Sequence, residues 1–342
     1  MAALSEVNAL GQRFWLDNLT RRMLDEGILA KYLENGVTGL TSNPAILLKG
    51  LKEDVHEAEY LAHLSGDTPE ERLESLVLPD IRRACDLFLP VHEKSHGEDG
   101  YVSLELPPKI AFDEETTISE AIRLGDLVGR PNLMIKVPAT PQGISALEKL
   151  VSLGRSINVT LIFSLHQVFH VQEAYVRGIA KCSHPGKVRS VASLFLSRID
   201  TLIDGMLPED SHLAGKTGVS VAKVAYQRYL ERFHGEKRIA GNPQKLLWAS
   251  TGTKNPAYSD LLYVEPLIGR ETVNTLPDQT LSAFLHHGVA EDALEREVDE
   301  AMMQLVELER AGIDLEAACN RLFEEGMQSF DKAYTELLSL VS

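Results

Sequence analysis

Short apolar or β-branched runs alternate with longer helical patterns along the whole chain, and this alternation constrains the fold more than any other feature. Strands that alternate with helices indicate β–α units, which build parallel sheets. Eight such units close a (β/α)8 barrel, the TIM barrel, and 342 residues suffice for one. We predict a single α/β domain over residues 1–342, with strands at 13–17, 39–43, 101–106, 133–139, 157–163, 190–197, 245–250 and 272–276.

Additional helices are predicted around the barrel and at the end of the chain. Ser164 and Thr140-Pro141 are start signals for helices over residues 165–180 and 144–153. The acidic stretch 52–74 is predicted to be a solvated helical insertion between the second and third strands. We interpret two C-terminal apolar stripes as core-packing faces of helices. They consist of Val298, Ala301, Met302, Leu305 and Val306, and of Leu315, Ala318, Cys319, Leu322 and Phe323.

Charge and hydropathy limit the classes of partner. With 34 basic and 50 acidic side chains the net charge is −16, and no basic block is present, so nucleic acid and anionic membranes are not expected partners. No window reaches the roughly 18 apolar residues that span a bilayer, and the start of the chain lacks the features of a signal peptide. We therefore expect a cytoplasmic monomer or homodimer whose three cysteines are reduced and bind no metal.

A lysine stands in the middle of one predicted strand. Lys136 lies in the run Leu-Met-Ile-Lys-Val-Pro-Ala-Thr over residues 133–140. Burial disfavours the charged ammonium, and a neutral amine is a nucleophile that can form a Schiff base with a ketone. An edge-strand lysine that reaches out to water is the alternative.

Polar residues recur at every second position of the predicted strands, near their C-terminal ends. Alternate positions of a strand point to opposite faces, and we call each alternating set a parity. Both faces of a parallel barrel strand are normally apolar, so this recurrence needs an explanation. Any single position could be a strand-end turn residue or a small filler, but seven strands share the pattern. If this parity faces inward, the side chains meet at the barrel mouth, where active sites of this fold lie. The set comprises Asp17, Thr41, Asn43, Ser103, Glu105, Lys136, Asn158, Thr160, Ser193 and Ser250.

Two carboxylates in this set fit the chemistry of a Schiff-base lysine. A Schiff-base enzyme needs proton transfers when the carbinolamine forms, when it loses water and when the carbon–carbon bond breaks. One group in a single geometry cannot serve all three steps. Asp17 and Glu105 are the candidates. A structural ion pair between Lys136 and either carboxylate is the competing account.

Four motifs together resemble the transaldolase family. Residues 39–46 (Gly-Leu-Thr-Ser-Asn-Pro-Ala-Ile) look like its second-strand motif, and residues 133–150 are similar to its Schiff-base-lysine motif. Residues 157–164 (Ile-Asn-Val-Thr-Leu-Ile-Phe-Ser) resemble its fifth-strand motif, and residues 15–19 (Trp-Leu-Asp-Asn-Leu) its opening one. The similarity covers essentially the whole chain.

The resemblance implies roles for particular residues and no cofactor or metal. Lys136 would form the covalent intermediate with a ketose phosphate, and Asp17 would take the C4 hydroxyl proton. Glu105 would move protons through a water held by Thr160. Sugar hydroxyls would bind Asn43, Asn158 and Ser193, and the phosphate would bind Ser250, Arg198 and Lys254. Lys254 is a departure, because the better-known branch of the family has an arginine two residues after the serine, whereas Lys254 follows Ser250 by four.

The family resemblance implies transfer of a dihydroxyacetone unit from sedoheptulose 7-phosphate to glyceraldehyde 3-phosphate, a step of the pentose phosphate pathway. Two alternatives stay open: a fructose 6-phosphate aldolase that releases dihydroxyacetone, and a sugar-phosphate-binding barrel without turnover. The first of these tends to carry Gln and Tyr where Glu105 and Phe195 stand.

Two further motifs are not expected to have a function. Gly215-Lys216-Thr217 is like the end of a phosphate-binding loop but lacks the earlier glycine and a preceding strand. His166 and His170 have the spacing of zinc ligands on a helix, yet Gln167 stands where a zinc protease has Glu.

Overall fold

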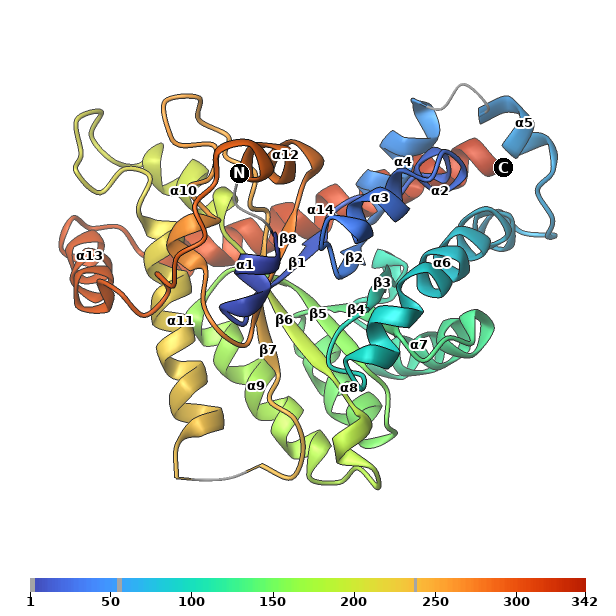
Figure 1. Cartoon of the computed structure of the whole chain (residues 1–342), viewed down its shortest axis with the longest axis horizontal. Helices are drawn as coiled ribbons and strands as arrows, with labels where there is room; N and C mark the ends of the chain where they lie inside the picture. The colour runs from blue at the N-terminus through green and yellow to red at the C-terminus, as the bar shows by residue number, and fades with distance from the viewer. Residues whose placement is uncertain (1–3, 54–56, 237–238) are drawn as a thin grey trace.

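A computed structural model describes residues 4–53, 57–236 and 239–342. Its eight parallel strands form a closed barrel in chain order, and β8 pairs with β1 (Figure 1). The predicted TIM barrel and all eight predicted strands are confirmed. The observed strands are β1 (Arg13–Leu16), β2 (Gly39–Thr41), β3 (Val102–Glu105), β4 (Leu133–Pro138), β5 (Ile157–Ile162), β6 (Ser190–Phe195), β7 (Lys245–Ala249) and β8 (Thr272–Leu276).

Helices surround the barrel and start where their capping residues predict. The Thr140 side chain accepts a hydrogen bond from Gly143 N at the start of α8, and Ser164 forms a reciprocal capping box with Gln167 at the start of α9. The α-helices are α1 (Leu4–Ala9), α2 (Arg21–Asp25), α3 (Ile28–Glu34), α4 (Pro44–Lys52), α5 (Glu57–Ala62), α6 (Pro69–Lys94), α7 (Glu114–Val128), α8 (Pro141–Ser152), α9 (Leu165–Ile179), α10 (Ser197–Asp204), α11 (Thr217–His234), α12 (Asp278–His287), α13 (Val298–Arg310) and α14 (Leu315–Val341).

The acidic stretch 52–74 is helical over part of its length, in α5 and the first turns of α6, as predicted; its residues 54–56 lie outside the described part of the chain. In the part of the chain that the structure describes, no helix is both long and apolar enough to cross a membrane.

A tryptophan of β1 packs against the neighbouring strand below the strand C-termini. Trp15 is buried, and its Nε1 donates a hydrogen bond to Asp99 Oδ1 at 3.0 Å. The neighbouring strand has Gly39 at this level, where a Cβ would lie 2.6 Å from Trp15 Nε1. Only glycine leaves room for the indole, so Trp15 packs tightly against β2 at this level of the barrel.

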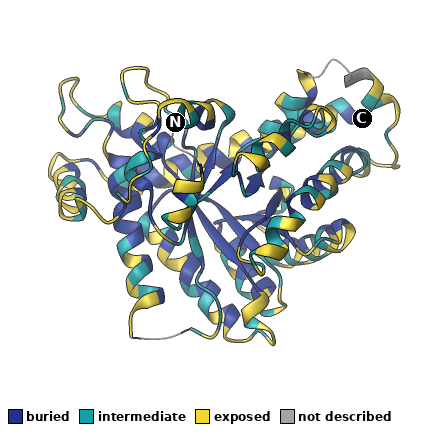
Figure 2. Ribbon diagram, viewed as in Figure 1, coloured by how far each residue is buried: buried dark blue, intermediate teal, exposed yellow. Residues whose placement is uncertain are grey.

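The first C-terminal apolar stripe is only partly buried, which corrects the predicted core-packing face. Ala301 is buried, but the side chains of Met302 and Val306 are 45% and 44% exposed. Helix α13 packs on α11 at the edge of the molecule, and its outer surface meets solvent (Figure 2). An apolar stripe wider than the contact with one neighbouring helix leaves its margin exposed. The second stripe is buried at Ala318, Cys319 and Leu322, as predicted.

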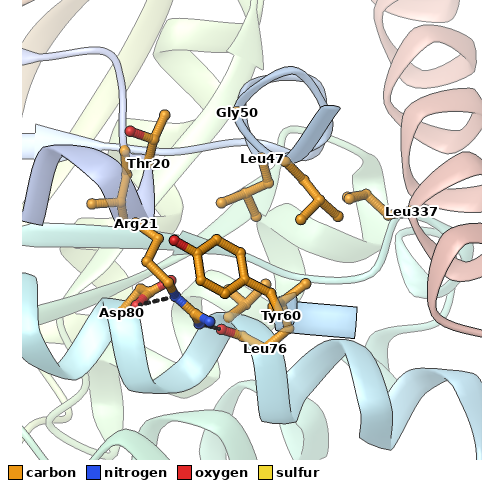
Figure 3. Close-up of a pocket in the computed structure, with 11 residues that line it drawn as sticks. Thr20, Arg21, Leu47, Gly50, Tyr60, Leu76, Asp80 and Leu337 are labelled. Carbon is orange, nitrogen blue, oxygen red and sulfur yellow. Dashed lines mark hydrogen bonds and ion pairs between the residues drawn. The ribbon is translucent and has the colours of Figure 1, made fainter. Parts of the chain in front are cut away.

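The last helix crosses the molecule from α10 and β5 to α4 and α6 (Figure 1). Its far end forms a second hydrophobic cluster made of Leu51, Leu73, Leu76, Leu337 and Val341. Beside this cluster is a small pocket of about 50 Å³ in which Leu337 and Leu47 face the side chain of Tyr60 (Figure 3). Arg21 closes it, with Nε 3.0 Å from Asp80 Oδ2 and its guanidinium 4.6 Å from the centroid of the Tyr60 ring.

Replacing Leu337 with alanine should lower the free energy of unfolding by about 2 to 4 kcal/mol, because it opens a cavity in this cluster. Urea denaturation followed by circular dichroism measures the loss. The matched control is Leu153→Ala, since that side chain is 49% exposed and its removal should change stability by no more than about 0.5 kcal/mol. Equal effects would mean that the end of α14 is not part of the cooperative fold.

Candidate active site

A cavity of about 280 Å³ opens at the C-terminal ends of the barrel strands. Ten site residues are predicted from the sequence, and all but Glu105 and Asn158 line this cavity. The eight that line it are Asp17, Asn43, Lys136, Thr160, Ser193, Arg198, Ser250 and Lys254. The inward parity therefore brings residues from most of the chain to one place.

Lys136 points into the barrel and is only 4% exposed. Its Nζ lies 2.7 Å from Glu105 Oε2 and donates a hydrogen bond to Ser42 O at 3.0 Å. Register explains the first contact, because Glu105 and Lys136 are directly paired across β3 and β4. Since β4 also pairs with β5, the lysine is not on a sheet edge, and the edge-strand alternative is wrong.

The ion pair considered from the sequence is thus present, and it holds a carboxylate against the amine. Burial raises the pKa of Glu105, and the nearby charge of Lys136 opposes that rise. Two buried oxygens, Glu105 Oε1 of this pair and Thr160 Oγ1 of the cavity-lining Thr160, have no hydrogen-bond partner among the described residues. Buried oxygens of this kind are normally satisfied by protein or water, so each is a candidate partner for a water or a substrate hydroxyl.

Asp17 follows β1 directly and is held by threonines of the neighbouring strands. Its Oδ1 accepts a hydrogen bond from Thr41 Oγ1 at 2.7 Å, and Thr41 Oγ1 lies 2.6 Å from Thr275 Oγ1. Burial raises the pKa of the Asp17 carboxyl, while Lys136 and the Thr41 hydrogen bond act in the opposite direction. A carboxyl with a raised pKa is a stronger base than an exposed aspartate and is suited to accept a proton.

Asn158 and Asn43, two of the predicted hydroxyl-binding residues, already make hydrogen bonds within the protein. Asn158 is fully buried, donates to Ser103 Oγ at 3.1 Å and accepts from Ser193 Oγ at 2.7 Å, so it lies behind the cavity wall and orients Ser193. Asn43 lines the cavity but also caps α4, where its Oδ1 accepts a hydrogen bond from Ile46 N at 3.0 Å.

Two cations face the cavity with no carboxylate paired to them among the described residues. Arg198 stands in the first turn of α10, with its guanidinium 5.6 Å from the centroid of the Phe195 ring. Burial lowers its pKa, although Asp17 and Glu325 oppose this. Lys254 reaches the cavity from the loop after β7. Unpaired cations in a cavity are suited to an anionic group such as phosphate.

Ser250 lines the cavity although its position in the strand pattern does not predict this. On β7 the cavity-lining positions are Leu247 and Ala249, so Ser250 has the opposite parity. Its φ of 53° is left-handed, and this turn brings its Oγ to 2.8 Å from Ser197 Oγ. The residue is in the cavity as predicted, but the reason given by parity is wrong.

Comparison with known proteins agrees with this geometry. The profile of the family described as Transaldolase/Fructose-6-phosphate aldolase matches residues 14–341. The chain belongs to this family. It is similar to the transaldolase of Thiobacillus denitrificans (51% identity, 100% of both chains) and to that of Neisseria gonorrhoeae (46%, 99% of both). It is 40% identical to the transaldolase of Trichodesmium erythraeum over 98% of this chain and 96% of the relative. The family and enzyme class predicted from the motifs are confirmed.

In this member of the transaldolase/fructose-6-phosphate aldolase family, sequence reasoning missed part of the cavity wall. Ser329 and Phe330 reach it from α14, Lys49 from α4 and Thr275 from β8. The first two come from a helix far along the chain, so no strand pattern could place them. Thr275 had a local signal, because its parity on β8 is the inward one.

The motifs that were set aside lie away from this family site. No strand leads into Gly215-Lys216-Thr217, since α10 ends at Asp204 and α11 begins at Thr217. His166 and His170 are exposed, with their Nε2 atoms 2.7 Å apart. The described residues contain no cluster of three or more His, Cys, Asp or Glu that could hold a metal ion.

Proposed function

We propose that this chain is a transaldolase of the pentose phosphate pathway, acting in the cytoplasm through a Schiff base on Lys136. It moves a dihydroxyacetone unit from sedoheptulose 7-phosphate to glyceraldehyde 3-phosphate and gives erythrose 4-phosphate and fructose 6-phosphate. The single observation that carries the proposal is the position of Lys136 Nζ, inside the barrel and 2.7 Å from Glu105 Oε2, in a cavity shared with Asp17.

The covalent steps follow from the chemistry of the amine. Lys136 passes a proton to the paired Glu105 carboxylate, and its neutral nitrogen then attacks the ketone carbon. Loss of water gives an iminium ion. Asp17 takes the C4 hydroxyl proton, the C3–C4 bond breaks, and its electron pair moves toward the iminium nitrogen to form an enamine. The aldose phosphate leaves. The acceptor aldehyde then forms a new carbon–carbon bond in the reverse order, and water hydrolyses the product iminium to free the amine.

Glu105 serves the steps that add and remove water. A water between Glu105 Oε1 and Thr160 Oγ1 would satisfy both oxygens and carry protons to the carbinolamine. Burial raises the pKa of Glu105, which makes this carboxyl a better proton carrier than an exposed glutamate.

Binding of the substrate uses the remaining cavity residues. The phosphate binds Arg198, Lys254 and Ser250. The two cations suit this role because neither is paired with a carboxylate among the described residues. Asn43 and Ser193 bind sugar hydroxyls, and Asn158 acts on the substrate through the hydroxyl of Ser193 that it orients.

The activity test mixes the purified protein with fructose 6-phosphate, with and without erythrose 4-phosphate. We expect sedoheptulose 7-phosphate and glyceraldehyde 3-phosphate to form in equal amounts when the acceptor is present, with little free dihydroxyacetone. Free dihydroxyacetone in equal amount to glyceraldehyde 3-phosphate, with or without acceptor, would indicate the aldolase instead. Binding of fructose 6-phosphate without either product would indicate the non-catalytic barrel.

A further inference from the structure

Three hydroxyl or carboxyl groups from adjacent strands form a hydrogen-bonded row in the wall of the cavity. Thr275 of β8, Thr41 of β2 and Asp17 after β1 are joined by oxygen–oxygen distances of 2.6 Å and 2.7 Å. Both threonines are 2% exposed. Register brings them together, because Trp15 of β1 pairs with Thr275 on one side and with Gly39 on the other. Asp17 and Thr41 each follow one of the paired residues Trp15 and Gly39 by two positions, so they also lie side by side.

The hydrogen bonds of this row can run in only one donor-to-acceptor direction when Asp17 is ionised. An ionised carboxylate only accepts hydrogen bonds, so the single proton of the Thr41 hydroxyl points to Asp17. Thr41 Oγ1 is then an acceptor toward its other neighbour, and the Thr275 hydroxyl must donate to it. Thr275 therefore fixes the rotamer of the Thr41 proton and reaches Asp17 through the Thr41 hydroxyl.

We propose that Thr275 is a positioning residue, which acts through Thr41 to keep Asp17 ionised and oriented for removal of the C4 hydroxyl proton. The proposal rests on the function proposed above. A hydrogen bond to the charged form of a carboxyl favours that form, and here it opposes the burial of Asp17.

Other charges act on Asp17 independently of this row, so losing Thr275 should have a partial effect. Lys136 of β4, Lys254 of the loop after β7 and Arg198 of α10 favour the carboxylate. Asp278 of α12 and Glu105 of β3 disfavour it.

Replacing Thr275 with valine keeps the shape of the side chain and removes the donor. We expect the acid limb of the pH profile of kcat/KM to move to higher pH by about half a unit to one unit, since one pKa unit corresponds to tenfold in the ionised fraction. Below that limb kcat should fall about three- to tenfold, with KM little changed, and activity should recover at higher pH. Thr275→Ser restores the donor and should restore the profile.

The matched control is Thr272→Val, at the opposite end of the same strand. Thr272 is buried, and its hydroxyl donates to Gly269 O at 2.6 Å, away from the cavity. This change should lower the melting temperature and leave the pH profile in place. An unmoved profile in Thr275→Val, or equal shifts in both variants, would overturn the proposal.

A second measurement separates this proposal from the proposed function. Carbon-13 NMR of labelled aspartate, with the Asp17 signal assigned from Asp17→Asn, follows the titration of this carboxyl in the unliganded protein. The pKa of Asp17 should be higher in Thr275→Val than in the wild type and in Thr272→Val. If the wild-type protein proved inactive, the proposed function would fail, and this titration would still decide whether Thr275 acts on Asp17.

Discussion

Replacing Lys136 with methionine should abolish both turnover and covalent trapping of the substrate. Methionine has a similar length and no nucleophilic nitrogen, so kcat should fall by about four orders of magnitude or more, as for other enzymes that lose their nucleophile. The direct readout is borohydride reduction in the presence of fructose 6-phosphate, followed by peptide mass mapping. The wild-type protein should carry a three-carbon adduct on Lys136, and the variant should carry none.

The fold of this variant can be checked separately, because the change leaves Glu105 buried without its cation. Removing one partner of a buried pair leaves an uncompensated charge. Since burial already raises the pKa of Glu105, we expect its carboxyl to take up a proton and the protein to stay folded with reduced stability. A circular dichroism spectrum like that of the wild type would show that lost activity reflects lost chemistry.

A second buried lysine provides the matched control. Lys223 of α11 is also 4% exposed, and its Nζ donates to Ala293 O at 3.3 Å and Arg296 O at 2.6 Å. Burial lowers the pKa of Lys223, and this lysine lies outside the cavity. Lys223→Met should lose stability and still form the adduct on Lys136. An adduct on Lys223, or unmodified wild-type peptide, would contradict the Schiff-base assignment.

Strand pattern predicted the barrel because each strand carries its own signal. The eight runs, their order and the inward parity of Lys136 and Glu105 follow from residues close in sequence, and the closed barrel then makes neighbours of them. Parity works only where the backbone stays extended. Ser250 shows the limit, since a left-handed residue at the strand end reverses the side on which the side chain lies.

Tertiary packing decided what the sequence pattern could not. Ser329 and Phe330 belong to a helix whose apolar spacing predicts burial but does not identify what it covers. The partly exposed stripe of α13 shows the same limit. Its sequence shows an apolar face but not how much of that face the neighbouring helix covers. The row from Thr275 to Asp17 depends on closure of β8 against β1, the one strand contact that links the two ends of the barrel sequence.

Replacing Asp17 with alanine should impair cleavage far more than Schiff-base formation. Asp17 takes the C4 hydroxyl proton in the proposed mechanism, a step that follows formation of the iminium ion. Loss of a general base typically costs about 10²- to 10⁴-fold. Attack of Lys136 on the ketone uses Glu105 instead, so trapping of the substrate should slow by no more than about tenfold, which is small beside that loss.

The trapped species shows which step has failed. Brief borohydride treatment with fructose 6-phosphate should leave mainly the three-carbon adduct on the wild-type protein, because cleavage precedes reduction. In Asp17→Ala the same lysine should carry a six-carbon, phosphorylated adduct, because the iminium forms and the C3–C4 bond stays intact. Peptide mass spectrometry distinguishes the two adducts directly.

A neighbouring carboxylate tests whether this effect belongs to Asp17 alone. Asp278 begins α12, accepts hydrogen bonds from Asn18 Nδ2 at 2.6 Å and Tyr32 OH at 3.1 Å, and raises the pKa of Asp17 by its charge. Asp278→Ala removes a nearby negative charge without removing the proposed base, so it should keep the three-carbon adduct. If Asp17→Ala lost adduct formation and cleavage to the same extent, Asp17 would act before the carbon–carbon bond breaks, and the base would have to be sought among the other groups of the cavity.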